Sequence, residues 1–193
     1  MNALGTYSFL YIFVLVGQAI RVRKRIGKSP LTAFTQGGAV QRLGAAGGML
    51  LPLLLLAYPM WPAWFDASGV FLFLRNLPCR LAGVALLCAG SSVAAVAFET
   101  LGDAWRLGTD SNVTRLVAEG IYARVRHPIY AGMILIWLGV FLLTADVFFL
   151  VVFLVLAAAV NGQAALEERH MERLFAEQYG AYKARTGRFF PRL

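Results

Sequence analysis

The stretch GIYARVRHPIYAGM, from Gly120 to Met133, stands where a polar connection meets an apolar run that begins at Ile129. Proline suits the first turn of a helix and favours an extended conformation in the residue before it. We therefore expect a helix to start at Pro128, with His127 just ahead of it. The tyrosines and arginines around this boundary form either a belt that anchors a membrane helix or one wall of a site at the membrane surface.

The composition of the whole chain indicates an integral membrane protein. Its 193 residues are 59% hydrophobic and only 15% charged, which is more apolar side chain than one soluble core of this length can bury. Segments near the ~17 to 25 residues needed to cross a bilayer are Ala3 to Ile20, Leu43 to Phe65, Leu81 to Phe98, Ile129 to Ala145 and Val147 to Leu166. The predicted fold is an all-α integral membrane protein with about five transmembrane helices, a C-terminal helical hairpin and a cytoplasmic C-terminal helix.

The hairpin is predicted from a single residue. Only Asp146 separates the last two apolar segments. An Asp at the bilayer centre costs roughly 2.5 to 3.5 kcal/mol on insertion scales, so a tight turn is favoured over one long helix.

The basic residues predict the orientation. Of the 18 Lys and Arg residues, only Arg75 and Arg80 fall outside the first connection, the third connection and the tail after Leu166. By the positive-inside rule, these three parts are cytoplasmic and the N-terminus is outside. Topology and anionic lipid headgroups account for the net charge of +8, so no nucleic-acid partner is expected. The small size of the chain suggests a prokaryotic cytoplasmic membrane.

The chain reads as one membrane domain over residues 1–193, with the first three spans in 1–98 and the loop, hairpin and C-terminal segment in 99–193. Cys79 and Cys88 are expected on one helix, ~13 Å apart along its axis, which is too far for a disulfide. No metal-ligand spacing is present, and no metal is expected. Gly44 and Gly48 have the GxxxG spacing of close helix packing, within the chain or, less favoured, in a dimer.

The helix start at Pro128 offers an anion site. Its unpaired N–H groups and positive dipole end would lie beside Arg124 and Arg126. The alternative is an aromatic and basic belt with Tyr122 and Tyr130 at headgroup depth. Taken alone, this stretch favours the belt.

The tail changes that interpretation. On one helical projection from Glu167, both Glu167 and Glu168 fall on the apolar face, together with Met171, Leu174, Phe175, Tyr179 and Tyr182. Carboxylates held against packed surface indicate a bound cation or hydrogen-bond donor. Salt bridges to Arg124 or Arg126 explain the pair equally well when it is considered by itself.

The hairpin brings His127 and Glu167 to the same end of the last two spans, near the polar residues Asn161, Gly162 and Gln163. A pocket there would combine a helix N-terminus and arginines for an anion, carboxylates and tyrosine faces for a cation, and an apolar wall. S-adenosylmethionine has a carboxylate, sulfonium and ammonium charges, and an adenine ring. It is therefore the predicted cofactor.

The run LVAEGIYARVRHPIYAGM, followed after the hairpin by EERHMERLFAEQYGAYKARTGRFFP, resembles the C-terminal signature of the isoprenylcysteine carboxyl methyltransferase family and its phospholipid methyltransferase relatives. The specific match covers about Leu116 to Pro191, and the spans before it are similar in number and spacing to those of short prokaryotic members. The resemblance implies a membrane enzyme that encloses S-adenosylmethionine between its last helical hairpin and its C-terminal segment.

The resemblance also assigns site residues. It implies that the cofactor is bound by Leu116, Val117, Gly120, Tyr122, His127, Pro128, Tyr130, Glu167 and Glu168. Arg126 is implied near the reacting group, and Arg188 to Pro191 match the short tail motif. If the acceptor is an amine, His127 or Glu168 is the candidate base. The predicted catalytic residues are Arg126, which would orient the acceptor, and Glu168. Ala176 departs from the pattern, because relatives often have Gly there; on the projection it lies on the polar face.

The predicted function is S-adenosylmethionine-dependent methyl transfer to a lipidic or prenyl-type acceptor at the cytoplasmic interface. A carboxylate acceptor is slightly preferred, because it is ionised at pH 7 and needs only an orienting cation such as Arg126. The amine of a phospholipid would need a base as well. A small transporter or sensor is the non-enzymatic alternative, disfavoured because the ionisable residues gather at one interface rather than near the midplane. The acceptor, O- against N-methylation and the oligomeric state stay open.

Overall fold

The computed structural model describes residues 20, 24, 71–102 and 116–192. Apart from Ile20, the predicted spans Ala3 to Ile20 and Leu43 to Phe65 lie outside the described residues, as does the Gly44 and Gly48 pair. The described elements are η2 (Leu72–Leu74), α5 (Leu77–Leu101), η4 (Gly120–Ala123), α6 (Pro128–Thr144) and α7 (Val147–Arg185). The described part of the chain is therefore helical, with one isolated bridge, between Val125 and Gly187.

Helix α5 covers the third predicted span, Leu81 to Phe98, and extends beyond it at both ends. Its N-cap is Asn76, whose side-chain oxygen accepts a hydrogen bond from the backbone N–H of Cys79 at 2.9 Å. Pro78 occupies the first turn, where its missing N–H costs nothing. By length and composition, α5 and α7 are long and apolar enough to cross a membrane. Cys79 and Cys88 lie on α5 and are both free, as predicted.

The predicted hairpin is confirmed. Helix α6 begins at Pro128, with His127 as its N-cap, and ends at Ala145, whose φ of 49° is left-handed. Asp146 then starts α7 by accepting a hydrogen bond from the backbone N–H of Phe148 at 2.7 Å. The carboxylate that would be costly inside a continuous helix therefore serves as a helix cap.

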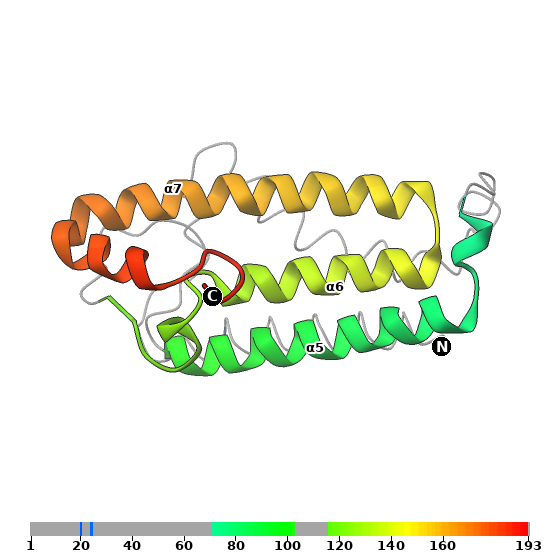
Figure 1. The fold of residues 1–193 in the computed structure, drawn as a ribbon, viewed down its shortest axis with the longest axis horizontal. Coiled ribbons are helices and arrows are strands. Elements are labelled where there is room, and N and C mark those ends of the chain that lie inside the picture. Colours follow the sequence, from blue (N-terminus) through cyan, green and yellow to red (C-terminus); the bar gives the residue numbers. More distant parts are fainter. Residues whose placement is uncertain (1–19, 21–23, 25–70, 103–115, 193) are drawn as a thin grey trace.

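Helices α5 and α6 run antiparallel and approach closely through glycines (Figure 1). A Cβ added at Gly90 would lie 2.5 Å from the carbonyl oxygen of Gly132, and one added at Gly139 would lie 2.7 Å from that of Gly83. The two glycines of each helix are seven residues apart, so both contacts fall on one seam. Small residues let membrane helices approach in this way.

Helix α6 lies between α5 and α7 (Figure 1). Its Ile136, Trp137 and Val140 are buried in a core with Leu87 of α5 and Phe149 of α7. The outer faces of α5 and α7 expose large apolar side chains, which is the surface expected of helices in contact with lipid. They include Leu81, Val84, Val96, Val151, Leu154 and Val155.

Helix α7 bends sharply near its C-terminal end. Ala176 has φ 39° and ψ −115°, so the 39 residues of α7 are two helical pieces joined at this residue. Figure 1 shows the second piece turning back towards the start of α6. The single helical projection from Glu167 to Tyr182 was therefore wrong, because it assumed one axis. Ala176 is where the chain turns, in a conformation that glycine adopts readily and alanine does not.

Candidate functional site

The C-terminal tail returns to the start of α6. The backbone N–H groups of Arg126 and His127 donate to the carbonyl oxygens of Gly187 and Arg188 at 2.9 and 3.0 Å. The N–H of Gly187 donates in turn to the carbonyl oxygen of Arg124 at 3.1 Å. These bonds hold the tail beside the residues that precede α6, although the two segments are about 60 residues apart in sequence.

The loop before α6 is fixed from two sides. Val117 and Tyr122 are buried and pack with Ala97 of α5. The hydroxyl of Tyr182, on the returning piece of α7, donates to the carbonyl oxygen of Tyr122 at 2.8 Å. Burial raises the pKa of Tyr182 to about 12, against the lowering effect of Arg126 and Arg185, so the hydroxyl keeps its proton.

The other two site residues predicted in this loop are Gly120 and Leu116. Gly120 has a φ of 55° at the first position of η4, and a Cβ there would lie 3.0 Å from the side chain of Thr100. Leu116 is half-buried. The structure thus gathers Leu116, Val117, Gly120 and Tyr122 in one loop against α5.

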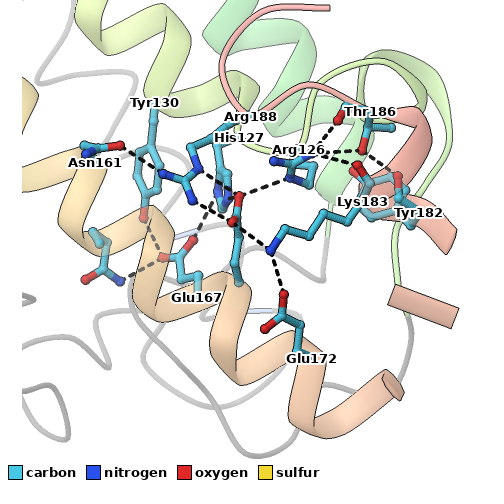
Figure 2. Close-up of polar contacts among 12 residues, drawn as sticks. Arg126, His127, Tyr130, Asn161, Glu167, Glu172, Tyr182, Lys183, Thr186 and Arg188 are labelled. Carbon is cyan, nitrogen blue, oxygen red and sulfur yellow. Dashed lines mark hydrogen bonds and ion pairs between the residues drawn. The ribbon is translucent and has the colours of Figure 1, made fainter. Parts of the chain in front are cut away.

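Glu168 is the centre of an ion-pair cluster. Its Oε1 lies 3.0 Å from Nε of both Arg126 and Arg188, and its Oε2 lies 2.7 Å from Arg188 Nη2. Lys183 Nζ is 3.7 Å from Oε2. In Figure 2 the three basic side chains converge from the start of α6, the end of α7 and the tail. The Glu168 side chain is only 2% exposed, and both of its carboxylate oxygens are paired with the protein's own cations.

This cluster keeps Glu168 ionised. Burial acts to raise the pKa of its carboxyl group, but the nearby His127 ring and the hydrogen bonds from Arg188 and Arg126 outweigh burial and hold the pKa well below its usual range. The predicted span of α7 ends at Leu166, so the group lies beyond the apolar segment.

Arg126 is committed to the same cluster. Besides the bond to Glu168, its Nη1 donates to the carbonyl oxygen of Lys183 at 3.2 Å and to that of Thr186. It thereby satisfies carbonyl groups at the C-terminal end of α7, which have no partner within the helix. The side chain of Arg124 is exposed. The expected anion site with both arginines beside the start of α6 is not assembled among the described residues.

Glu167 has a different set of partners. Its Oε1 accepts from the hydroxyl of Tyr130 at 2.5 Å and from Gln163 Nε2 at 2.8 Å, and its Oε2 is 3.5 Å from His127 Nδ1 (Figure 2). Within the described ranges, no Lys or Arg pairs with it. Its side chain is 23% exposed. Burial acts to raise its pKa, but the hydrogen bonds, led by that of His127, lower it, so the carboxylate is ionised without a Lys or Arg beside it.

His127 lies between the two carboxylates. Its Nε2 is 3.4 Å from Glu168 Oε1, and its ring stacks on Tyr130 with 5.6 Å between centroids. Burial acts to lower the pKa of His127, but its interactions with the Glu167 and Glu168 carboxylates outweigh burial and raise the pKa above its usual value. Pro128 follows, buried in the first turn of α6.

The structure thus brings His127, Pro128, Tyr130, Glu167 and Glu168 together with Arg126. It adds partners that were absent from the predicted site: Asn161, Gln163, Lys183 and Arg188. Gln163 and Asn161 stood out in the sequence as polar residues near the end of an apolar run. Nothing in the sequence shows that Lys183 and Arg188 turn back to meet Glu168, because that depends on the bend at Ala176.

The described part of the chain is helical, with two candidate membrane spans and a charged cluster at one end, which is the arrangement expected of a membrane protein. A model of the phospholipid methyltransferase family matches residues 78–178, which is more than half of the 193 residues. The chain belongs to the phospholipid methyltransferase family, a family of membrane methyltransferases. The match contains the start of α6 and both glutamates, and it ends before Lys183 and Arg188. A search of the curated proteins found no match.

Proposed function

We propose that this protein is a membrane methyltransferase that binds S-adenosylmethionine beside the α6–α7 hairpin, with Glu167 as the counterion of the cofactor's positive charge. The observation that carries the proposal is the contrast in partners: Glu168 is neutralised by two arginines and a lysine, whereas Glu167 contacts Tyr130, Gln163 and His127 and pairs with no Lys or Arg among the described residues. A partly exposed carboxylate without a Lys or Arg partner attracts a cationic ligand.

The polar groups around Glu167 fit such a ligand. Gln163 Oε1 is buried and has no hydrogen-bond partner among the described residues. Such an acceptor is costly to leave unpaired, and an ammonium or hydroxyl group of the cofactor would satisfy it. Glu167, Gln163 and the Tyr130 ring would therefore hold the cofactor. When bound, the cofactor supplies the methyl group on a sulfonium that makes it transferable.

The chain's own contribution is positioning and exclusion of water. Tyr130 and His127 fix the orientation of the Glu167 carboxylate, because each contacts one of its oxygens. The Glu168 cluster holds the tail against the start of α6. In this arrangement Arg126 acts as a positioning residue, and Glu168 acts through the tail rather than as a base.

For the acceptor, we favour a lipid amine over the carboxylate preferred from the sequence. Arg126, Lys183 and Arg188 all pair with Glu168, so an acceptor carboxylate finds no uncommitted partner among these three. An amine must lose a proton before it accepts a methyl group, and the Glu167 carboxylate, or His127 in its neutral form, is the group at hand to take it.

The cofactor proposal is tested by calorimetry with S-adenosylhomocysteine on the protein in detergent. We expect binding, together with a stabilisation of about 2.7 kcal/mol at a ligand concentration 100 times Kd. No binding at millimolar ligand would overturn the proposal.

The acceptor is tested by incubating the protein and membrane lipids with methyl-labelled S-adenosylmethionine and then treating the lipid extract with mild alkali. An N-methyl product keeps its label in the nitrogen-containing headgroup. A methyl ester releases it as methanol, and that result would restore the carboxylate acceptor.

A further inference from the structure

His127 presents both nitrogens of its ring to carboxylates (Figure 2). Nδ1 lies 3.5 Å from Glu167 Oε2, and Nε2 lies 3.4 Å from Glu168 Oε1. Nε2 is buried and makes no hydrogen bond within the described ranges, so its attraction to Glu168 is electrostatic. A neutral imidazole has one donor and one acceptor nitrogen, so one of the two carboxylates would face a lone pair. Only the imidazolium form, with a proton on each nitrogen, suits both neighbours.

The two carboxylates depend on this charge to different degrees. Glu168 is also paired with Arg126 and Arg188, at 3.0 and 2.7 Å, so it keeps its counterions when His127 loses its proton. Glu167 pairs with no Lys or Arg among the described residues, and its two hydrogen-bond donors are neutral side chains. The imidazolium is therefore the charged partner of Glu167 in this part of the chain.

The groups around His127 come from three elements. The two glutamates belong to α7, the Tyr130 ring of α6 stacks on the imidazole with 5.6 Å between centroids, and the Phe189 ring of the tail lies 6.2 Å away. The basic residues of this cluster contact Glu168: they are Arg126, Lys183 and Arg188. Burial acts to lower the pKa of His127, but the two carboxylates raise it above its usual value. The charged groups that act on the imidazole most strongly are thus both anions.

A cation bound at Glu167 competes with this charge. The proposed cofactor brings its ammonium group to the same carboxylate, so the ligand and a protonated His127 would be like charges beside one acceptor. Like charges at short range disfavour each other. Binding is therefore expected to lower the pKa of His127 and to favour loss of its proton. By linkage, a lower pH must then weaken binding.

We propose that His127 is an exchangeable counterion of Glu167, which carries a proton until the cationic group of the cofactor binds and then releases that proton to the solvent. This inference rests on the proposed function and adds a proton-coupled step to cofactor binding. Loss of the proton leaves His127 neutral, the form that can take a proton from an amine acceptor. Binding of the cofactor thereby prepares the base.

Proton release is measured by calorimetry of S-adenosylhomocysteine binding to the full chain in detergent. At about pH 6.5 the folded protein holds most of the His127 proton, and the ammonium group of the ligand stays protonated. The titration is repeated in phosphate and in Bis-Tris, whose ionisation enthalpies differ, so the difference in apparent binding enthalpy counts the protons released. We expect about half a proton or more from wild type. No release, or proton uptake, would overturn the inference.

Two variants assign the proton to a residue. His127→Gln should release none, whereas His170→Gln, which replaces the other histidine of the chain, should behave like wild type. Release that persists in His127→Gln, or that is lost in His170→Gln, would show that a different group titrates and would overturn the inference.

The pH profile of affinity separates this role from a structural one. Between pH 6 and 8 the wild-type affinity for S-adenosylhomocysteine should rise with pH, by up to about tenfold per unit, and that of His127→Gln should stay nearly constant. A histidine that only supports the fold would weaken binding equally at every pH when it is replaced, and parallel profiles in the two proteins would therefore contradict the exchange.

The wild-type measurements do not depend on the folding of any variant. They also tell the two proposals apart. If S-adenosylhomocysteine does not bind at any pH, the proposed function is overturned, and this inference with it. If the ligand binds without proton release and without a change of affinity between pH 6 and 8, only the inference is overturned.

Discussion

Glu167 and Glu168 are consecutive residues of one helix, yet their surroundings differ. Glu168 is buried among basic side chains that come from the start of α6, the end of α7 and the tail. Glu167 is partly exposed and is held by a tyrosine, a glutamine and a histidine. One carboxylate therefore holds the fold together at this end, and its neighbour keeps its charge available. An acidic pair in a sequence does not imply that both members share one role.

The largest effect is expected from Glu168→Gln. Removing one partner of a buried ion pair costs about 3 to 5 kcal/mol, because the arginines keep their charge and lose its counterpart. Thermal unfolding in detergent should show this loss, while protein that remains folded binds S-adenosylhomocysteine with nearly wild-type affinity. Unchanged stability with strongly weakened binding would reverse the roles assigned to the two glutamates.

Glu167→Gln should have the opposite profile. Losing a charge-assisted contact to the ammonium group of S-adenosylhomocysteine costs about 1.5 to 3 kcal/mol, or roughly tenfold to a hundredfold in affinity for that ligand. Stability should change little, since a glutamine carbonyl still accepts from Tyr130 and Gln163. Calorimetry on both variants checks the contrast, and equal affinities in Glu167→Gln and wild type would remove Glu167 from the site.

The pH dependence of stability reports on His127. Because its pKa is higher in the folded protein than in the unfolded chain, its contribution is fully present below about pH 6.5 and is lost as the pH rises through the folded pKa. The loss is about 1.4 kcal/mol for each unit by which the two pKa values differ. Denaturation between pH 6 and 9 should show this decline in wild type and not in His127→Gln.

Glu167→Gln sharpens that experiment, because Glu167 is the leading cause of the raised pKa of His127. The stability of the Glu167→Gln variant should decline less with rising pH than that of wild type. A full decline would mean that Glu168 alone sets the protonation of His127. Glu168 itself contributes in the other direction: its lowered pKa gives stability above about pH 4.3 that is lost as the pH falls.

The smallest effect is expected at the bend that brings Lys183 and Arg188 back to Glu168. Ala176 has a positive φ of 39°, so Ala176→Gly should relieve backbone strain and stabilise the protein by about 1 kcal/mol. The matched control is Ala181→Gly, in the helical piece that follows, where glycine should destabilise by about 0.5 to 1 kcal/mol. Destabilisation of similar size in both variants would mean that the bend stores no strain.

The elements of the described fold that local sequence determines were predicted well. Pro128 marks the start of α6, and Asp146 marks the hairpin, because proline and a capping carboxylate act on their own turn of helix. The seam between α5 and α6 was not foreseen. The glycines of α5 and α6 are paired only when the two helices are placed side by side, and the GxxxG pair that stood out lies outside the described residues. The five-span arrangement and its orientation stay predictions.

The candidate site also has features that the sequence determines and features that only the tertiary structure decides. The sequence by itself determined the membrane class, through its apolar composition, and the family, through the residues around His127 and the paired glutamates. These signals are local and survive any arrangement of the helices. Only the tertiary structure decided which glutamate is neutralised, because that depends on the bend at Ala176 and on backbone bonds between the tail and the start of α6. Ion pairs between residues as distant in sequence as Arg126 and Glu168 form by proximity in space, which residue types alone do not specify.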